Sequence, residues 1–545
     1  MNGSCVDTWE VLEALEGRGF RYVAHFGETG FQLAGSLQTE YGAHECTMLV
    51  SKDFSAPPAI ILRTIPQRLR PIAPHISNLG SLCYLSSSLI AINVFDPIGQ
   101  MLACVDRASF VLNEILAGRA LDDLVDEFFV YWGMADLICQ YDVADIDARD
   151  IQTYLRNDVA PHQLIVTDSL ARTRNKVAIA EDARLTGPFP AVLVRTQVSP
   201  RPNTEKWPIK TVGDLLDWQA GMESRAARRI EERLARCIEQ GIRAVTVVLL
   251  APKIHYAFSV SFNGPEGNRI STEKLRKKSV MRAITVYPIH VNRIDNRYVT
   301  QRNIPGMQTL SGKKITVVGC GTIGGYLAEL LMKAGAGSGS GRLTLIDDDS
   351  LASGNLGRHR LGFGYLDKNK AEALRDELEK TLPGVHVKAL PNDIRDVVLR
   401  GQDLIIDATG EEAMGSLLTR KYVDKCALIS VWTVGPGVAV RAVLKSKSEH
   451  ACPYCLTLHG KEGRYLPTVQ PIEQIYAGQG CEQEYVPFAA SASIQAACLA
   501  SELVLDWMCD HVGNNVRTRV LDEKYDGNAT RMAVERFDGC PACRT

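Results

Sequence analysis

The sequence has no long hydrophobic run and almost no net charge. Its apolar stretches all fall short of the roughly 18 residues that a membrane-spanning helix needs. Its opening segment, MNGSCVDTWEVLEALEGRGF, has no basic region followed by an apolar core and so lacks the pattern of a secretion signal. With 61 basic and 63 acidic side chains, the formal net charge of −2 offers no positive field for nucleic acid or an anionic membrane. We therefore expect a cytoplasmic protein that binds neither nucleic acid nor membranes directly.

The cysteines also lack the pattern of a disulfide-bonded secreted protein. Their number, 15, is odd, and nothing in the sequence indicates export. In a reducing compartment, closely spaced cysteines indicate metal binding or redox chemistry instead. The composition is otherwise ordinary for a globular protein, with 46% apolar and 23% charged residues, and 545 residues suffice for about two to four domains.

Residues 1–150 are predicted to form a compact α+β domain. A short amphipathic helix over residues 8–18 precedes three alternating stretches, RYVAHF, FQLAGSL and ECTMLV, which are typical of a strand meander. A helical pattern follows in QMLACVDRASFVLNEILAG. Residues 151–290 contain a long charged helix pattern and the strand-like segments RAVTVVLLA and YAFSVSF but no recognisable chemistry. We interpret them as a linker or docking domain.

Residues 291–545 alternate between buried strands and helices. KKITVVGCGTIGGYLAELLMKAG predicts a strand, a glycine turn and a helix, and RLTLIDDDS, DLIIDATG and CALISVWTVG predict further strands. This alternation predicts a doubly wound α/β domain with a parallel sheet. Gly319, Gly321 and Gly324 form GxGxxG at the turn, where glycines let the backbone approach a phosphate and the helix N-terminus favours its charge.

The residues after this turn bear on which nucleotide binds. Asp347 lies 23 positions after Gly324, at the end of the next strand, where a carboxylate can accept hydrogen bonds from a ribose. A dinucleotide-dependent dehydrogenase shares this pattern. Arg358 and Lys370, with Asn355, suit a triphosphate better than a nicotinamide cofactor, because departure of pyrophosphate needs positive charge nearby. On spacing alone, solvated surface positions for both cations are the simpler interpretation.

Several motifs in a fixed order resemble the ThiF and MoeB family, which is shared with ubiquitin-activating enzymes. They are VVGCGTIGG, IDDDSLASGNLGRH and DKNKAEALRDEL, and the resemblance covers about residues 291–545. It implies a Rossmann-like adenylation domain that uses ATP and Mg²⁺ and forms a homodimer. It also implies that Asp347 contacts the ribose, while Asn355, Arg358 and Lys370 bind phosphates and stabilise the leaving pyrophosphate. The nucleotide-binding residues expected from the motifs are Gly319, Gly321, Gly324, Asp347, Asp349, Asn355, Arg358, Lys370 and Asp407.

Two segments depart from or adapt this family pattern. NRYVTQRN resembles the family's RYxRQ, from which an arginine reaches the partner subunit's site, and here either Arg297 or Arg302 matches. Where the family has DCTDN, this sequence has DATGEE, so Asp407 matches the first aspartate but Gly410 replaces the second, which helps to hold magnesium. Glu411 or Asp407 is the candidate replacement.

Two CxxC pairs lie near the end of the sequence. Cys452 with Cys455 and Cys540 with Cys543 offer four thiolates, which suit a tetrahedral Zn²⁺ site that clips distant segments together. A thioredoxin-type redox pair is the alternative for either CxxC alone. The ThiF and MoeB family has the same two pairs in the same order, which favours structural zinc.

Cys481 lies in a glycine-flanked segment, YAGQGCEQEYVP, between the two CxxC pairs. In related activating enzymes a reactive cysteine occupies this loop and attacks the acyl-adenylate. Cysteine suits that step because part of it is thiolate near neutral pH and the thioester that it forms stays reactive. Cys498, on the predicted helix that follows, is interpreted as a core residue.

The segment FSAPPAIILR followed by PHISNLGSLCYL resembles the ubiquitin-conjugating fold over about residues 8–145, with Cys83 as the acyl carrier. His75 matches the histidine of the family's HPN motif. Ile76 and Ser77 replace its proline and asparagine, so the group that stabilises the oxyanion is either Asn78 or a backbone amide. Cys104 lies on a helical apolar stripe, which indicates core packing.

Together these resemblances imply an activating and a conjugating enzyme fused in one chain, as in the fusion enzymes of bacterial CBASS antiphage operons. The expected catalytic residues are Cys481, Cys83, Arg358, Lys370 and His75. The expected partner is a protein with a C-terminal glycine, either a cGAS/DncV-like nucleotidyltransferase or a bacterial ubiquitin-like modifier, and the acceptors are target protein amines. A sulfur-carrier adenylyltransferase, an NAD-dependent oxidoreductase with a zinc clip and a catalytically inactive scaffold are the alternatives.

Overall fold

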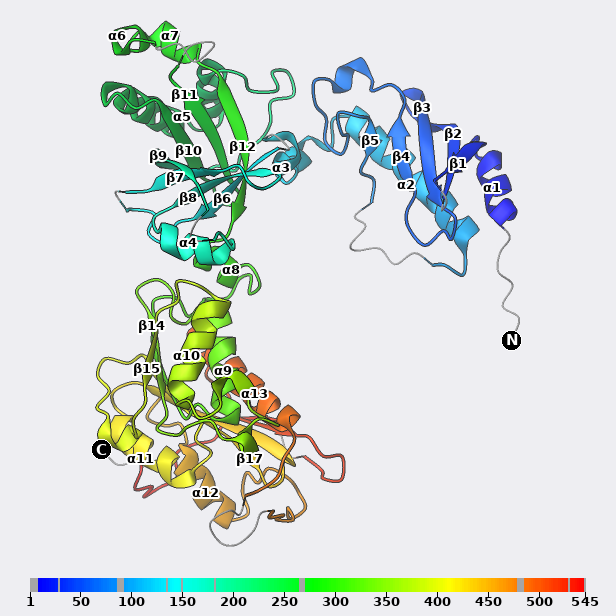
Figure 1. The fold of residues 1–545 in the computed structure, drawn as a ribbon. Helices are drawn as coiled ribbons and strands as arrows, with labels where there is room; N and C mark the ends of the chain where they lie inside the picture. Colours follow the sequence, from blue (N-terminus) through cyan, green and yellow to red (C-terminus); the bar gives the residue numbers. More distant parts are fainter. Residues whose placement is uncertain are drawn as a thin grey trace. The chain divides into compact units, whose positions relative to one another are not determined.

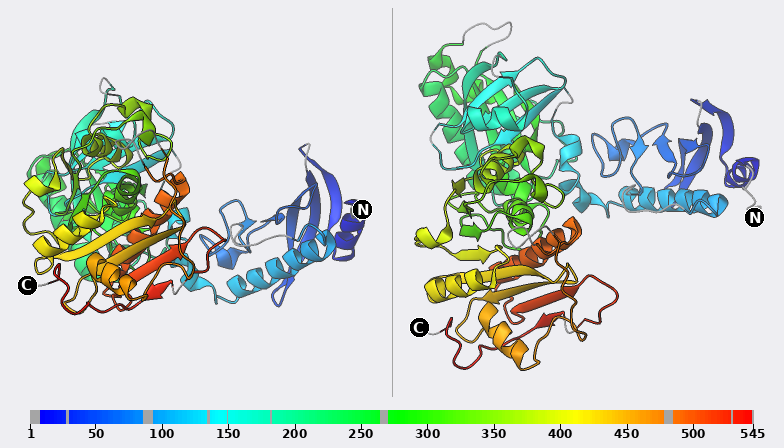
Figure 2. Two further views of the ribbon diagram at one scale, coloured as in Figure 1. Left: turned by 90° about the horizontal axis from the view of Figure 1, so that it is seen from below. Right: turned by 60° about the horizontal axis from the view of Figure 1, so that its bottom comes forward.

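The computed structural model describes residues 8–27, 30–85, 93–133, 136–148, 150–180, 183–263, 270–477, 485–527 and 530–543. The chain divides into two compact units, and Figures 1 and 2 show the helices and strands of the chain coloured along the sequence. One unit comprises residues 1–140, 151–166 and 185–292, and the other comprises residues 141–150, 167–184 and 293–545. Within the described ranges, no helix is long and apolar enough to cross a membrane.

The N-terminal part of the first unit is an antiparallel sheet with two helices. Its strands follow one another in sequence order, as the meander pattern predicted. The helices α1 (Thr8–Gly17) and α2 (Pro97–Leu116) pack against each other, and α2 also packs against β2. Cys104 is buried on α2, which confirms its place in the core. The strands are β1 (Arg21–Phe26), β2 (Gly30–Thr39), β3 (Gly42–Ser51), β4 (Ala59–Leu62) and β5 (Ser81–Leu82).

A closed barrel follows, which the sequence did not predict. Its seven strands are hydrogen-bonded in the order β10-β11-β12-β6-β8-β7-β9. The predicted charged helix is α5 (Val212–Glu239), which begins with a capping box between Thr211 and Asp214. The strands are β6 (Leu137–Asp142), β7 (Gln152–Arg156), β8 (His162–Thr167), β9 (Thr186–Arg195), β10 (Ala244–Leu250), β11 (His255–Ser261) and β12 (Val286–Arg293).

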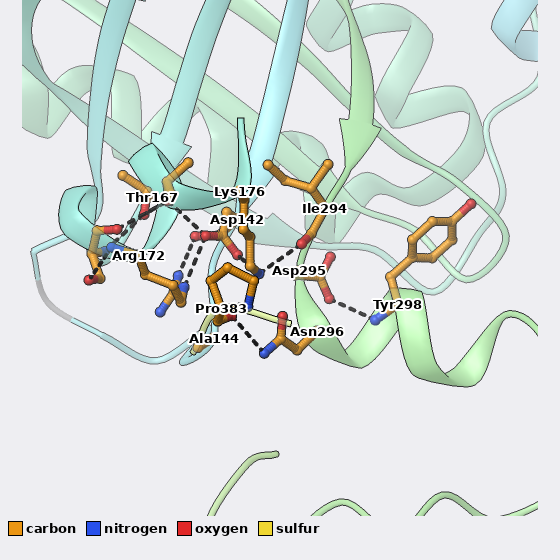
Figure 3. A network of polar contacts seen from close by, with 12 residues as sticks. Asp142, Ala144, Thr167, Arg172, Lys176, Ile294, Asp295, Asn296, Tyr298 and Pro383 are labelled. Carbon is orange, nitrogen blue, oxygen red and sulfur yellow. Dashed lines mark hydrogen bonds and ion pairs between the residues drawn. The ribbon is translucent and has the colours of Figure 1, made fainter. Parts of the chain in front are cut away.

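A buried network of ion pairs ties short segments of the chain to the second unit (Figure 3). The carboxylate of Asp142, at the end of β6, accepts hydrogen bonds from Lys176 Nζ at 2.7 Å and Arg172 Nε at 2.9 Å. Lys176, on α4 (Leu170–Lys176), also donates to the carbonyl oxygen of Ile294 at 2.9 Å. Because a buried ion pair with further hydrogen bonds holds its partners in one geometry, the network fixes α4 to the start of α8 (Asn296–Gln301).

The second unit is built on an eight-stranded sheet. Five strands, β15-β14-β13-β16-β17, are parallel as predicted, and β18, β19 and β20 continue the sheet in antiparallel fashion. The strands are β13 (Lys314–Val318), β14 (Arg342–Ile346), β15 (Val387–Leu390), β16 (Leu404–Asp407), β17 (Ala427–Val434), β18 (Ala439–Lys445), β19 (Val516–Val520) and β20 (Arg531–Met532).

Helices cover both faces of this sheet, because its parallel strands are apolar on both sides. Alternate residues of the strands pack with α9 (Thr322–Lys333), α10 (Lys370–Thr381) and α13 (Ala490–Met508) in one cluster. The intervening residues, such as Val318 and Ile405, pack with α11 (Glu412–Tyr422) in another. The chain therefore turns from strand to helix at the carboxyl ends of β13, β14 and β16, where a ligand cavity is expected.

Candidate active site

The glycine turn after β13 requires two of its three predicted glycines. Gly319 has φ +86°, and a Cβ there would lie 2.8 Å from the backbone nitrogen of Thr409. A Cβ on Gly324 would lie 1.8 Å from the carbonyl oxygen of Gly319. Gly321 caps α9 and has open space around it. The turn thus brings bare backbone and the N-terminus of α9 to the edge of a cavity, the arrangement that suits a phosphate.

That cavity has a volume of about 630 Å³ and lies at the carboxyl ends of the parallel strands. This volume lies within the range of small-molecule sites and is large enough for a nucleotide. Its walls carry the glycine turn, an acidic strand end and three cations. The charged residues that line it are Asp347, Asp348, Asp349, Arg358, Lys370, Asp393, Arg395 and Glu411.

Asp347 is held by the glycine turn itself. Its Oδ2 accepts a hydrogen bond from the backbone nitrogen of Cys320 at 2.6 Å, and its Oδ1 accepts one from that of Asp349 at 2.9 Å. Burial raises the pKa of the Asp347 carboxyl, while these hydrogen bonds oppose the shift. The carboxylate is therefore fixed in place and keeps lone pairs that can accept ribose hydroxyls.

The three cations of the cavity differ in their partners. Lys370 Nζ donates to Asp349 Oδ2 at 2.8 Å, and Arg395 Nε donates to Asp393 Oδ2 at 2.8 Å. Arg358 forms no ion pair with any residue that the structure describes. Its guanidinium instead faces aromatic rings, so its charge is available to an anionic ligand.

Three predicted nucleotide-binding residues, Gly324, Asn355 and Asp407, do not line this cavity. Asn355 ends a short turn in which its side-chain oxygen accepts a hydrogen bond from the backbone nitrogen of Ala352 at 3.1 Å. Asp407 is buried in a neighbouring cavity of about 410 Å³, where Thr409 Oγ1 donates to its Oδ1 at 2.7 Å. Burial raises the pKa of Asp407. Of the two carboxylates considered for magnesium, Glu411 is therefore the one that lines the nucleotide cavity.

The residues at this edge suit a hard cation. Carboxylate oxygens of Asp347, Asp348 and Asp349 lie within 4.8 Å of one another. Oxygen ligands from one or two carboxylates, with phosphates and water, are what Mg²⁺ uses beside a nucleotide. The chemistry of these side chains thus fits the predicted metal.

The four CxxC cysteines lie together and are buried. The sulfur of Cys452 is 3.6 Å from that of Cys455 and 3.8 Å from that of Cys540, and Cys455 Sγ is 3.7 Å from Cys543 Sγ. Four sulfurs at tetrahedral Zn–S distances lie about 3.8 Å apart, so this spacing fits one zinc ion. A redox CxxC pair acts alone and does not need the other pair beside it. Here the two pairs lie together although Cys452 and Cys540 are 88 positions apart in the sequence, which favours a shared metal ion.

Cys481 falls outside the described residues, which stop at Ala477 and resume at Tyr485. These two residues pair with each other, since each backbone nitrogen donates to the other's carbonyl oxygen at 2.9 Å. Cys498 is partly buried on α13, in keeping with a packing role.

Cys83 is exposed directly after β5. Its backbone nitrogen donates to the carbonyl oxygen of His75 at 2.7 Å, so the two predicted residues lie side by side. Partial burial, followed by the negative charge of Glu127, raises the pKa of the Cys83 thiol. The site thus presents an accessible sulfur that is not activated in advance as a thiolate.

His75 is enclosed by two carboxylates that the sequence analysis missed. Its Nδ1 lies 2.5 Å from Glu127 Oε1 and its Nε2 lies 2.9 Å from Asp123 Oδ2. The hydrogen bond to Glu127 is the largest cause that raises the pKa of His75, to about 9. Both ring nitrogens therefore face carboxylate oxygens, and the backbone nitrogen of His75 also donates to Glu127 Oε2 at 2.8 Å. Asn78 is exposed on the same turn, before Gly80.

Known protein families match the N-terminal and the C-terminal parts of the chain separately. Residues 296–540 match the ThiF family, and residues 29–137 match prokaryotic E2 family B. An ATP-dependent ubiquitin transferase-like protein, Cap2, from Pseudomonas aeruginosa is 38% identical, and the alignment covers 98% of each chain. A Cap2 protein from Escherichia coli is 25% identical over 97% of each chain.

Proposed function

We propose that this chain adenylates the C-terminal glycine of a partner protein and transfers that partner to amines of target proteins. The chain belongs to the family of ATP-dependent ubiquitin transferase-like proteins and is an activating and conjugating enzyme. One observation carries this proposal: a single chain holds both a nucleotide-sized cavity, lined by an arginine that no described residue pairs with, and an exposed cysteine in a conjugating-type domain. An acyl-adenylate made in the first can supply the acyl group that the second carries.

The adenylation step uses the charges of the cavity. The carboxylate of the partner's terminal glycine attacks the α-phosphate of ATP, and the bond to the β-phosphate breaks to release pyrophosphate. Arg358 and Lys370 stabilise the negative charge that develops on the leaving group. Carboxylates of the Asp347–Asp349 strand end and Glu411 would hold Mg²⁺, which would supply positive charge to neutralise the phosphates. Asp347 orients the ribose.

Two thioesters follow the adenylate. The thiolate of Cys481 attacks the acyl carbon and AMP leaves. The thiolate of Cys83 then attacks the Cys481 thioester, which returns the Cys481 sulfur as a thiolate. A target amine attacks the Cys83 thioester, loses a proton and forms an amide, and the Cys83 sulfur leaves. Joining both cysteines in one chain makes the second transfer intramolecular.

The partner that we propose is a bacterial cGAS/DncV-like nucleotidyltransferase with a C-terminal glycine, and its attachment to cytoplasmic targets would serve antiphage defence. A bacterial ubiquitin-like modifier and a sulfur carrier are the alternatives. Zn²⁺ bound by Cys452, Cys455, Cys540 and Cys543 would tie the end of the chain to β18 and α12 (Pro453–Lys461). Residues 1–150 would conjugate, residues 151–290 would link or dock, and residues 291–545 would adenylate, as a homodimer to which Arg297 or Arg302 contributes.

The test is an intact mass measurement under non-reducing conditions with ATP, Mg²⁺ and a purified glycine-ended cGAS/DncV-like nucleotidyltransferase. We expect a thiol-labile adduct on the wild type and on Cys83→Ala, and none on Cys481→Ala. Release of pyrophosphate without any adduct would favour sulfur-carrier chemistry. If the wild type releases no pyrophosphate with either a nucleotidyltransferase or a ubiquitin-like protein, the proposal is wrong.

A further inference from the structure

We infer that Phe488, helped by Tyr485, is a positioning residue that holds the Arg358 guanidinium over the phosphate-binding part of the cavity without neutralising its charge. This inference rests on the proposed function, in which Arg358 stabilises the leaving pyrophosphate. The Arg358 guanidinium carbon lies 4.7 Å from the centre of the Phe488 ring and 5.5 Å from that of Tyr485. All three residues line the nucleotide cavity.

The backbone nitrogen of Arg358 donates to the carbonyl oxygen of Asn355 at 3.0 Å, but no described residue forms a hydrogen bond or ion pair with its side chain. The neighbouring His359 is buried, and its Nε2 lies 2.9 Å from the carbonyl oxygen of Cys320 in the glycine turn. Arg358 Nε is buried, and no described residue accepts a hydrogen bond from it. Among the residues that the structure describes, the rings of Phe488 and Tyr485 are therefore the contacts that restrain the guanidinium.

Rings and carboxylates restrain a cation with opposite consequences. The carboxylates that hold Lys370 and Arg395 cancel their charge locally, so a phosphate must compete with Asp349 or Asp393. An aromatic face attracts the guanidinium through its quadrupole but carries no net charge. Arg358 can thus be ordered in advance while its full positive charge remains for the phosphates, which is the preorganisation that electrostatic catalysis requires.

The backbone that carries each ring is held by local structure. Phe488 immediately precedes the N-cap of α13, and Gly437 leaves room for it: a Cβ on Gly437 would lie 3.1 Å from the Phe488 Cβ. The backbone of Tyr485 is paired with Ala477 by two hydrogen bonds of 2.9 Å. Phe488 is the closer ring and is partly buried, whereas Tyr485 is exposed. The larger effect is therefore expected from Phe488.

The experiment measures calorimetric binding of ATP·Mg and of AMP to the full-length chain. Phe488→Leu keeps apolar bulk but removes the ring, and we expect it to weaken ATP binding about tenfold while AMP binding changes less than about twofold, because Arg358 faces the phosphates that AMP lacks. Phe488→Tyr restores an aromatic face and should bind ATP like the wild type. Phe363→Leu, the same change at an exposed position of this unit, is the matched control.

A double-mutant cycle separates positioning from general damage. In an Arg358→Ala background, Phe488→Leu should have no further effect on ATP binding, since its action passes through the missing guanidinium. The inference is overturned if Phe488→Leu weakens ATP and AMP equally, if the two changes are additive, or if wild type and Phe488→Leu bind ATP alike. A wild type that binds no ATP overturns the proposed function itself, and the inference with it.

Discussion

The two reactive regions of the chain arrange charge in opposite ways. In the nucleotide cavity, an arginine without an ion-pair partner among the described residues faces open space, and neutral rings restrain it. Beside Cys83, two carboxylates enclose an imidazolium and add negative charge around an exposed thiol. Aromatic rings thus restrain the arginine in one region, whereas carboxylates hold the histidine in the other.

This difference matches the chemistry that each region is proposed to perform. Adenylation produces an anionic leaving group, which a free cation stabilises. Transfer from Cys83 brings in an amine that is protonated at neutral pH, and nearby carboxylates favour a cation. A thiol whose pKa is raised is also a poorer target for adventitious electrophiles, because the thiolate is the reactive form.

The largest expected effect comes from removing one of the four cysteines proposed to bind zinc, which sharpens the comparison by disturbing one unit alone. In Cys540→Ser the cluster loses one of its four thiolates, and we expect less than half of the zinc to remain. The C-terminal segment should also lose about 5 kcal/mol of protection against hydrogen exchange, because structural zinc contributes its binding energy to folding. Metal analysis and hydrogen exchange of β18 and β2 peptides measure this. Cys426→Ser, outside the cluster, is the control. Loss of protection in β2 as well would contradict separate units.

The next effect should come from Arg358, which forms no ion pair within the described ranges. Arg358→Ala should lower ATP–pyrophosphate exchange about 10²- to 10³-fold, the usual result of removing one preorganised donor from developing charge. Arg395→Ala is the matched control: Arg395 lines the same cavity but is paired with Asp393 and largely exposed, so a smaller loss, under about tenfold, is expected. Equal losses would remove the distinction between paired and unpaired cations.

Much of the fold could be predicted because its signals are local. The strand β13, the glycine turn and α9 follow from an apolar run, three glycines and a helical period within a short segment. The network around Asp142 could not be predicted, since Lys176 lies 34 positions away and has no marking pattern. Closure of the barrel likewise depends on pairing β9 with β10 across a long helix.

The candidate sites show the same limit. Glycine spacing and CxxC pairs indicated Gly319 and the four buried cysteines, because backbone strain and metal ligation demand particular residue types. Glu127 contacts His75 across 52 positions and lies in an acidic segment that resembles a solvated surface. Phe488 lacked a signal for a similar reason, since an aromatic residue before a helix is usually interpreted as core.

A moderate effect is expected from the imidazolium beside Cys83. Because the folded-state pKa of His75 is raised to about 9, its pairing stabilises the N-terminal domain below the unfolded value near 6.5, and this stability is lost as pH rises through 9. His75→Asn, which tolerates the positive φ but cannot titrate, should cost about 1–2 kcal/mol at pH 6.5 and much less at pH 9.5. Hydrogen exchange of β2 and β3 peptides at several pH values measures it. A cost that does not depend on pH would show that His75 is neutral in the folded protein.

The smallest effect concerns the charge that faces the thiol. Glu127→Gln removes a negative charge that raises the Cys83 pKa, so the thiolate fraction at pH 7.5 should increase about two- to threefold, since burial, the larger cause, is retained. The rate of iodoacetamide labelling of the Cys83 peptide, followed by mass spectrometry across pH, reports this pKa. Glu114→Gln is the control, because Glu114 pairs with Arg119 instead. A fall in the labelling rate would mean that Glu127 acts on Cys83 mainly by holding His75, so the contrast between the two regions would then lie in their geometry and not in their charge.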